Sequence, residues 1–144
     1  MAELEDLNGK WLRALADLEN YKRRTERERR FWTASAKEEV LLSLLDVVDD
    51  LERALSSEPD AGADGDVGFR DGIELIVQRL AEILRGHGVR PIDALGEEFD
   101  PTVHEAVAQV ESNDHAADAV VEEMRKGYMI GDKLLRPARV VVAK

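Results

Sequence analysis

The most constraining feature of the sequence is residues 4–56, which contain no proline and a single glycine, Gly9. A stretch without these breakers can remain one helix. Apolar or small residues recur in it at alternating steps of three and four, at Leu4, Leu7, Trp11, Ala14, Leu18 and Tyr21. This is the a/d spacing of a coiled coil. The sequence therefore predicts a long N-terminal coiled-coil helix.

A second apolar seam follows on the same stretch, out of phase with the first and separated from it by polar sequence, at Leu41, Leu44, Val48, Leu51 and Leu55. A helix of fifty residues is roughly 80 Å long, whereas a compact chain of this length has a radius of gyration of about 15 Å. The helix would project beyond any globule that the chain can build, so its apolar seams need a partner. The simplest partner is a second copy, and we expect a homodimer. The alternative, a helix folded back as a hairpin, is disfavoured because no glycine or proline interrupts its middle.

Residues 56–68 are acidic and rich in Gly, Asp and Ser, which predicts a mobile linker. After it, Phe69, Ile73, Ile76, Leu80 and Ile83 mark a second amphipathic helix that ends at Gly86 and Gly88. This shorter helix is expected to pack antiparallel on the long one, and two such pairs would make a dimeric four-helix bundle. The predicted dimer interface comprises Leu4, Leu7, Trp11, Leu18, Leu44, Val48, Leu51, Leu55, Ile73 and Leu80.

Short Val-rich segments punctuated by Gly and Pro begin at Val89, which favours strands. They cover residues 89–92, 106–110, 119–124 and 139–142, and residues 126–135 resemble a hairpin that turns near Gly131 and Asp132. We therefore expect an α+β fold, with a helical dimerisation region over residues 1–88 and a small, mostly antiparallel β domain over residues 89–144.

The charge balance limits the classes of partner. The chain has 31 acidic and 20 basic residues, a formal net charge of −11, and no cysteine. Such an acidic chain is a poor general binder of nucleic acid or anionic membrane. The acidic N-terminus lacks an apolar signal core and no apolar run is long enough to span a bilayer. We expect a cytoplasmic protein.

Motifs for catalysis are incomplete. His104 and Glu105 open a His-Glu-x-x-His pattern, but position 108 is alanine. Asp100 and His104 are more simply interpreted as a turn cap and a histidine packed at the domain surface. No phosphate-binding glycine loop and no Gly-x-Ser-x-Gly elbow is present. We expect no catalytic residues, no metal and no cofactor, and therefore not an enzyme.

Residues 22–30 hold six basic residues and two acidic ones. This run can be a solvated face with pairs such as Glu26–Arg30, a surface that docks an acidic protein, or a DNA-reading basic region of the bZIP type. DNA binding is the least favoured, because apolar seams flank both sides of the run and the chain is acidic. The neighbouring Phe31 and Trp32 cannot both fit one narrow seam, so at least one should be partly exposed.

Several blocks resemble the GrpE family, in the family's order and spacing. They lie at residues 19–26, 44–55, 72–75 and, most closely, 99–107, followed by Lys126-Gly127-Tyr128 and residues 135–140. The resemblance implies a homodimeric cochaperone that binds the nucleotide-binding domain of a DnaK-type chaperone, opens its cleft and accelerates ADP release. It also implies cooperation with a DnaJ-type cochaperone in protein folding and the heat-shock response. Two alternatives to this exchange factor remain. One is a dimeric coiled-coil DNA binder that uses residues 22–30, and the other is a plain scaffold coiled coil with a β cap.

The resemblance also implies which residues contact the chaperone: Lys22, Arg23, Arg30, Glu74, Gly88, Phe99, Pro101 and Val142. Arg30 is included because Phe31 stands where the family has a lysine. GrpE proteins often carry a disordered extension before the long helix. Only a few residues precede the heptads here, so we expect any function of that extension to be absent or trimmed. In many relatives the long helix melts reversibly, and the polar gap between the seams is the expected weak point. Circular dichroism without a helix-loss transition before global unfolding would count against this.

Overall fold

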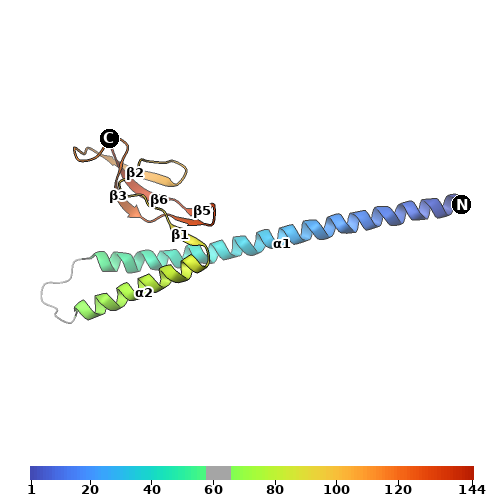
Figure 1. The fold of residues 1–144 in the computed structure, drawn as a ribbon, viewed down its shortest axis with the longest axis horizontal. Helices are drawn as coiled ribbons and strands as arrows, with labels where there is room; N and C mark the ends of the chain where they lie inside the picture. The colour runs from blue at the N-terminus through green and yellow to red at the C-terminus, as the bar shows by residue number, and fades with distance from the viewer. Residues whose placement is uncertain (58–65) are drawn as a thin grey trace. The chain divides into compact units, whose positions relative to one another are not determined.

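The computed structural model describes residues 1–57 and 66–144. The chain divides into two units, residues 1–41 and 42–144. The elements, in chain order (Figure 1), are helices α1 (Ala2–Ser56) and α2 (Asp66–Gly86), then strands β1 (Val89–Pro91), β2 (His104–Val110), β3 (Val120–Arg125), β4 (Tyr128–Ile130), β5 (Lys133–Arg136) and β6 (Ala138–Ala143). The predicted α+β fold class is confirmed.

Helix α1 is continuous from Ala2 to Ser56, which confirms the long helix and excludes the folded-back hairpin. Glu3 and Glu5 lie in its first turn, where negative charge complements the helix dipole. At the other end, the hydroxyl of Ser56 donates to the carbonyl of Arg53 at 3.0 Å, which satisfies one of the last free carbonyls. Residues 1–34 are exposed throughout, and the ion pairs within them join positions three or four apart on the helix itself.

Helix α2 begins at Asp66, before the predicted start at Phe69, and ends at Gly86 as predicted. Gly88 follows with φ +83°, a left-handed conformation that glycine adopts without steric cost, and its N–H donates to the carbonyl of Arg85 at 3.0 Å. Most of the predicted mobile linker, residues 58–65, lies outside the described residues.

Within the second unit, α2 runs antiparallel beside the end of α1 (Figure 1). The side chain of Arg70 on α2 bonds the exposed carbonyls at the end of α1, with Nη1 donating to Ser57 at 2.7 Å and Nη2 donating to Leu55. Leu45 and Val48 on α1 and Leu84 on α2 are buried at 0%, 3% and 3% exposure. The predicted antiparallel pairing is therefore present, and part of the second seam already packs inside a single chain.

The β domain contains two three-stranded sheets, ordered β1-β4-β5 and β2-β6-β3. The pairs β1–β4, β4–β5 and β3–β6 are antiparallel, whereas β2 and β6 are parallel. The predicted mostly antiparallel domain is confirmed, as is the hairpin, since Gly131 and Asp132 connect β4 to β5. The parallel pair joins strands distant in the sequence, with β3, β4 and β5 between them.

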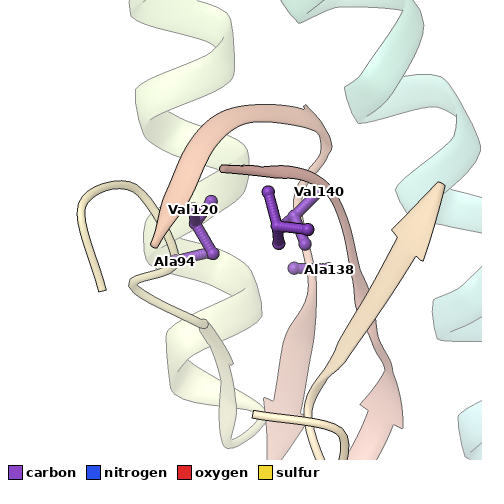
Figure 2. Close-up of a cluster of buried hydrophobic side chains, with 5 residues drawn as sticks. Ala94, Val120, Ala138 and Val140 are labelled. Atoms are coloured by element: carbon purple, nitrogen blue, oxygen red, sulfur yellow. The ribbon is translucent and has the colours of Figure 1, made fainter. Parts of the chain in front are cut away.

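A small apolar cluster forms the centre of this domain (Figure 2), and its members are Ala94, Val120, Ala138, Val140 and Val142, with Phe99 packed against it. Gly127, at the entry to β4, lies against the backbone where β5 passes into β6. A Cβ atom at this position would lie 2.3 Å from the nitrogen of Ala138 and 2.8 Å from the carbonyl carbon of Pro137. The glycine is therefore required by space, and it allows the two sheets to approach at this point.

Candidate functional site

The basic run of α1 is an exposed face. Lys22 and Arg23 are exposed, and Arg30 is 76% exposed while its guanidinium bonds Glu26 at 3.1 Å. The predicted Glu26–Arg30 pair is thus confirmed. Arg24 also approaches Glu28 at 4.0 Å. These exposed pairs contribute little stability, and they reduce the positive charge that the face presents to a partner.

Phe31 and Trp32 follow the basic run on the same helix. Their side chains are 66% and 70% exposed, and the two rings contact each other edge to face at 6.3 Å between centroids. The expectation that at least one of them is partly exposed is confirmed for both in the described chain.

The apolar stripe near the start of α1 is uncovered within a single chain. Leu4, Leu7, Trp11 and Leu18 are 73%, 66%, 60% and 46% exposed. The members of the second seam differ, because Val48 is buried and Leu44, Leu51 and Leu55 are half-buried in the chain itself. On α2, the predicted interface residues Ile73 and Leu80 are also half-buried.

The most exposed apolar stripe of α2 is instead formed by Phe69, Ile76 and Ile83, which are 67%, 54% and 49% exposed. These residues are seven positions apart, so they lie along one side of the helix. The sequence placed them in the amphipathic pattern but did not separate the side that packs on α1 from the side left open.

The loop before β2 carries two predicted contact residues, Phe99 and Pro101. Pro101 is exposed, and Phe99 is half-buried against the β-domain cluster. Val142 is only 2% exposed and belongs to that cluster. Its side chain therefore packs within the cluster against which Phe99 lies, and the expectation that Val142 contacts the chaperone stays a prediction.

Hydrogen bonds fix the shape of this loop. The carboxylate of Asp100 accepts from the N–H of Thr102 at 2.9 Å and from its hydroxyl at 2.7 Å. Because these bonds stabilise the charged form, the pKa of Asp100 is lowered from its usual value. The N–H of Asp100 donates to Nδ1 of His104 at 3.0 Å, which requires the neutral ring to carry its proton on Nε2.

The predicted turn cap at Asp100 is confirmed. His104 is 6% exposed, so the expectation that it packs at the domain surface is wrong. The reason is that His104 opens β2 directly beside Ala138 of β6, and its ring tilts against Phe99 at 6.0 Å between centroids. Both residues are used in building the loop.

Two further predicted residues lie elsewhere in the second unit. Glu74 is exposed on α2, and it lines a polar groove of about 790 Å³ together with residues from the end of α1 and from β3. Gly88 lies at the junction of α2 and β1, where its carbonyl accepts from the N–H of Gly131 at 2.9 Å.

Two polar side chains that line this groove have buried atoms without a partner among the described residues. Oε2 of Glu123 and Nε of Arg125 are buried without a hydrogen-bond partner. Burial raises the pKa of the Glu123 carboxyl and lowers the pKa of Arg125, because desolvation penalises each charged form.

The strongest polar contact of the second unit was not predicted. Arg136 of β5 is 6% exposed and forms two hydrogen bonds with Asp49 of α1, at 2.7 Å and 2.6 Å. Nearby, Nζ of Lys126 lies 2.7 Å from Oε1 of Glu52 on the same helix. The sequence signal that could have indicated this contact is Arg136 itself. An arginine in a strand with apolar neighbours is expected to pair with a carboxylate if it is buried.

These residues form surfaces that can bind another protein. Among the described residues, no three His, Asp or Glu side chains gather closely enough to hold a metal ion. None of the described helices combines the length and apolar character that crossing a membrane requires. The fold and the surfaces define an α+β protein with exposed basic and apolar helix faces and a small β domain.

Comparison with known proteins gives the family. The GrpE family model matches residues 1–144. Protein GrpE of Methylobacterium nodulans is 46% identical over 147 aligned positions, which cover 99% of this chain and 65% of that protein. Protein GrpE of Brachyspira hyodysenteriae is 42% identical, covering 99% of this chain and 71% of the relative, and that of Bacillus subtilis is 40% identical, covering 96% and 73%. The chain belongs to the GrpE family, and this membership supports a cochaperone role.

Proposed function

We propose that this protein is a nucleotide exchange factor that binds the nucleotide-binding domain of a DnaK-type chaperone and accelerates release of ADP. The observation that carries the proposal is the family match, which extends over the whole chain. The exchange factor changes the conformation of its partner and catalyses no covalent step of its own. It acts in the cytoplasm, together with a DnaJ-type cochaperone, in protein folding and the response to heat.

The physical basis is differential affinity. A protein that binds the open nucleotide cleft more tightly than the closed one shifts the chaperone toward the open state. By linkage, the exchange factor lowers the chaperone's affinity for ADP by the same factor by which bound ADP lowers its affinity for the exchange factor. A coupling of about 100-fold corresponds to about 2.7 kcal/mol, which a modest number of contacts can supply.

The proposed docking residues are of two kinds. Lys22, Arg23 and Arg30 give α1 an exposed basic face that suits an acidic protein surface and would steer association at low salt. Phe99 and Pro101 give the β domain an apolar contact on a loop braced by hydrogen bonds. Glu74 and Gly88 are proposed contacts on α2 and at its end.

We further propose a homodimer. The uncovered stripe of α1 supports it, because a long helix gains most of its stability from packing of an apolar face. The stripe of α2 formed by Phe69, Ile76 and Ile83 offers a second apolar surface for the same contact. Sedimentation equilibrium at micromolar concentration tests this directly, and a monomer at all concentrations would contradict it.

The exchange function is tested by stopped-flow release of a fluorescent ADP analogue from the cognate DnaK-type chaperone. The wild-type protein should accelerate release strongly. Arg23→Glu should weaken the acceleration, most clearly at low salt, because it reverses one charge of the basic face. Arg13→Glu is the matched control, since it makes the same charge change on the same helix outside residues 22–30.

Acceleration by the wild type that survives Arg23→Glu but is lost with Arg13→Glu would contradict the proposed docking face. A folded wild-type dimer that leaves ADP release unchanged would contradict the exchange function itself. In that case, salt-dependent binding of duplex DNA would favour the DNA alternative, and its absence would favour a scaffold.

A further inference from the structure

Arg136 connects separate parts of the second unit. Its Nη1 and Nη2 donate to the two carboxylate oxygens of Asp49 on α1, at 2.7 Å and 2.6 Å. Its Nε donates to the main-chain carbonyl of Lys126 at 2.9 Å. A guanidinium is planar and presents its donors in a fixed fork, so bonds in three directions leave it a single orientation.

The ring of Tyr128 packs against the guanidinium of Arg136. Tyr128 is the register partner of Arg136 in the β4–β5 pair, and its ring centroid lies 5.2 Å from the guanidinium carbon. The Lys126–Glu52 ion pair lies alongside, and Glu52 is three residues after Asp49 on α1. Positions three apart lie on one face of a helix. Arg136 of β5 and Lys126, which lies two residues before β4, therefore hold this part of the β domain against one face of α1 through two ion pairs.

Arg136 is also connected, through β6, to the loop that holds Phe99 and Pro101. Only Pro137 separates Arg136 from Ala138, the first residue of β6. The N–H of Ala138 donates to the carbonyl of Val103 at 3.0 Å. Further along β6, Val140 and Val142 belong to the cluster on which Phe99 packs. The position of the loop thus depends on the strand whose start is held by Arg136.

We propose that the Arg136–Asp49 pair is an orienting latch: it fixes the β domain on the second-unit part of α1 and so positions Phe99 and Pro101 for the chaperone. The inference rests on the proposed exchange function. A buried ion pair often contributes no more stability than apolar side chains of similar volume, but its geometry is directional. Apolar contacts alone would allow the hairpin to shift along the helix. The pair therefore makes Arg136 a positioning residue.

Stability and orientation can be separated with two variants. Arg136→Met leaves the Asp49 carboxylate, which is only 13% exposed, without its partner and should lower the midpoint of thermal unfolding. The double variant Asp49→Leu with Arg136→Met removes both charges and should return the midpoint close to that of the wild type. Any defect that remains in the double variant then reflects lost orientation.

Orientation is measured by pulsed electron–electron double resonance, as the distance between spin labels at Ala54→Cys on α1 and Asn113→Cys in the β domain. Both positions are exposed, and the chain has no cysteine of its own. Labelled protein is mixed with an excess of unlabelled chain so that only distances within one chain are recorded. The distance distribution should be narrow with the latch intact and broad in the double variant.

The functional readout is ADP release measured against the concentration of the exchange factor. The concentration for half-maximal acceleration should rise about tenfold if the docking-competent orientation falls to about a tenth of the population. The maximal rate at saturation should stay unchanged, since docking selects the competent orientation. The matched control removes the exposed pair Arg139–Glu105, which spans 3.2 Å at 48% and 53% exposure, and should change neither quantity.

A double variant with wild-type stability, a narrow distance distribution and an unchanged half-maximal concentration would overturn the latch. If the double variant fails to fold, Arg136→Lys replaces it, because a lysine keeps the charge but loses the fork. It should broaden the distribution, and a narrow one would likewise overturn the proposal. If the wild type does not accelerate ADP release, the exchange function fails, and the distance distributions still decide whether the latch orients the β domain.

Discussion

Gly127→Ala is the sharpest test of how the β domain is assembled. The added methyl carbon would lie 2.3 Å from the nitrogen of Ala138, 2.8 Å from the carbonyl carbon of Pro137 and 2.9 Å from the Cα of Ala138. All three are backbone atoms, so no side chain can rotate away to relieve the contact. The bend between β5 and β6 must move instead.

The expected cost is about 1–3 kcal/mol, the usual range for an overpacked site, with the upper end favoured because backbone must shift. A loss of about 2 kcal/mol corresponds to about 30-fold faster amide exchange in segments that exchange by opening of the whole domain. Hydrogen exchange followed by mass spectrometry on peptides from β3, β4 and β6 measures this directly. The helical peptides of residues 1–34 should be unaffected.

Gly9→Ala is the matched control, because the same methyl group would meet no atom within 4 Å on exposed α1. It should leave the β-domain peptides unchanged and slightly favour the helix. Wild-type exchange rates in the β-domain peptides of Gly127→Ala would refute the reasoning, since they would mean that the close approach of β4 and β6 is not required.

Two further predictions concern pH. Burial raises the pKa of Tyr128 to about 12, so the folded state favours the neutral phenol, and this stability is present below about pH 10 and is lost as the pH rises toward 12. Chemical denaturation should therefore show the wild type losing of order 2 kcal/mol more than Tyr128→Phe over that window, and parallel curves would refute it. Burial likewise raises the pKa of Glu123, so Glu123→Gln should stabilise the protein at pH 7 by about 1 kcal/mol. This gain should disappear below the unfolded-state pKa of about 4.5, and a gain that persists in acid would implicate something other than the charge.

The local elements were open to prediction because they depend on near neighbours in the chain. Absence of proline and an a/d repeat are sufficient to predict α1, and Val-rich runs punctuated by glycine predict the strands. The turn at Gly131 and Asp132 and the cap at Asp100 are also local, and both occur as expected. The basic face of α1 could be predicted for the same reason.

The site was less accessible where it depends on burial. The turn cap at Asp100, between Phe99 and Pro101, was correctly expected, but the burial of Val142 and His104 was not. Their burial follows from the parallel pairing of β2 with β6, which brings His104 beside Ala138. No local pattern distinguishes that pairing from an antiparallel one, because the two strands are far apart in the chain.

By itself, the sequence determined the helices, the strand segments and the family. Only the tertiary structure decided that Asp49 meets Arg136, 87 residues away, and that Gly127 must be a glycine. The physical reason is that periodicity and turn chemistry are properties of short segments, whereas a buried ion pair or a backbone contact exists only after distant segments have been brought together.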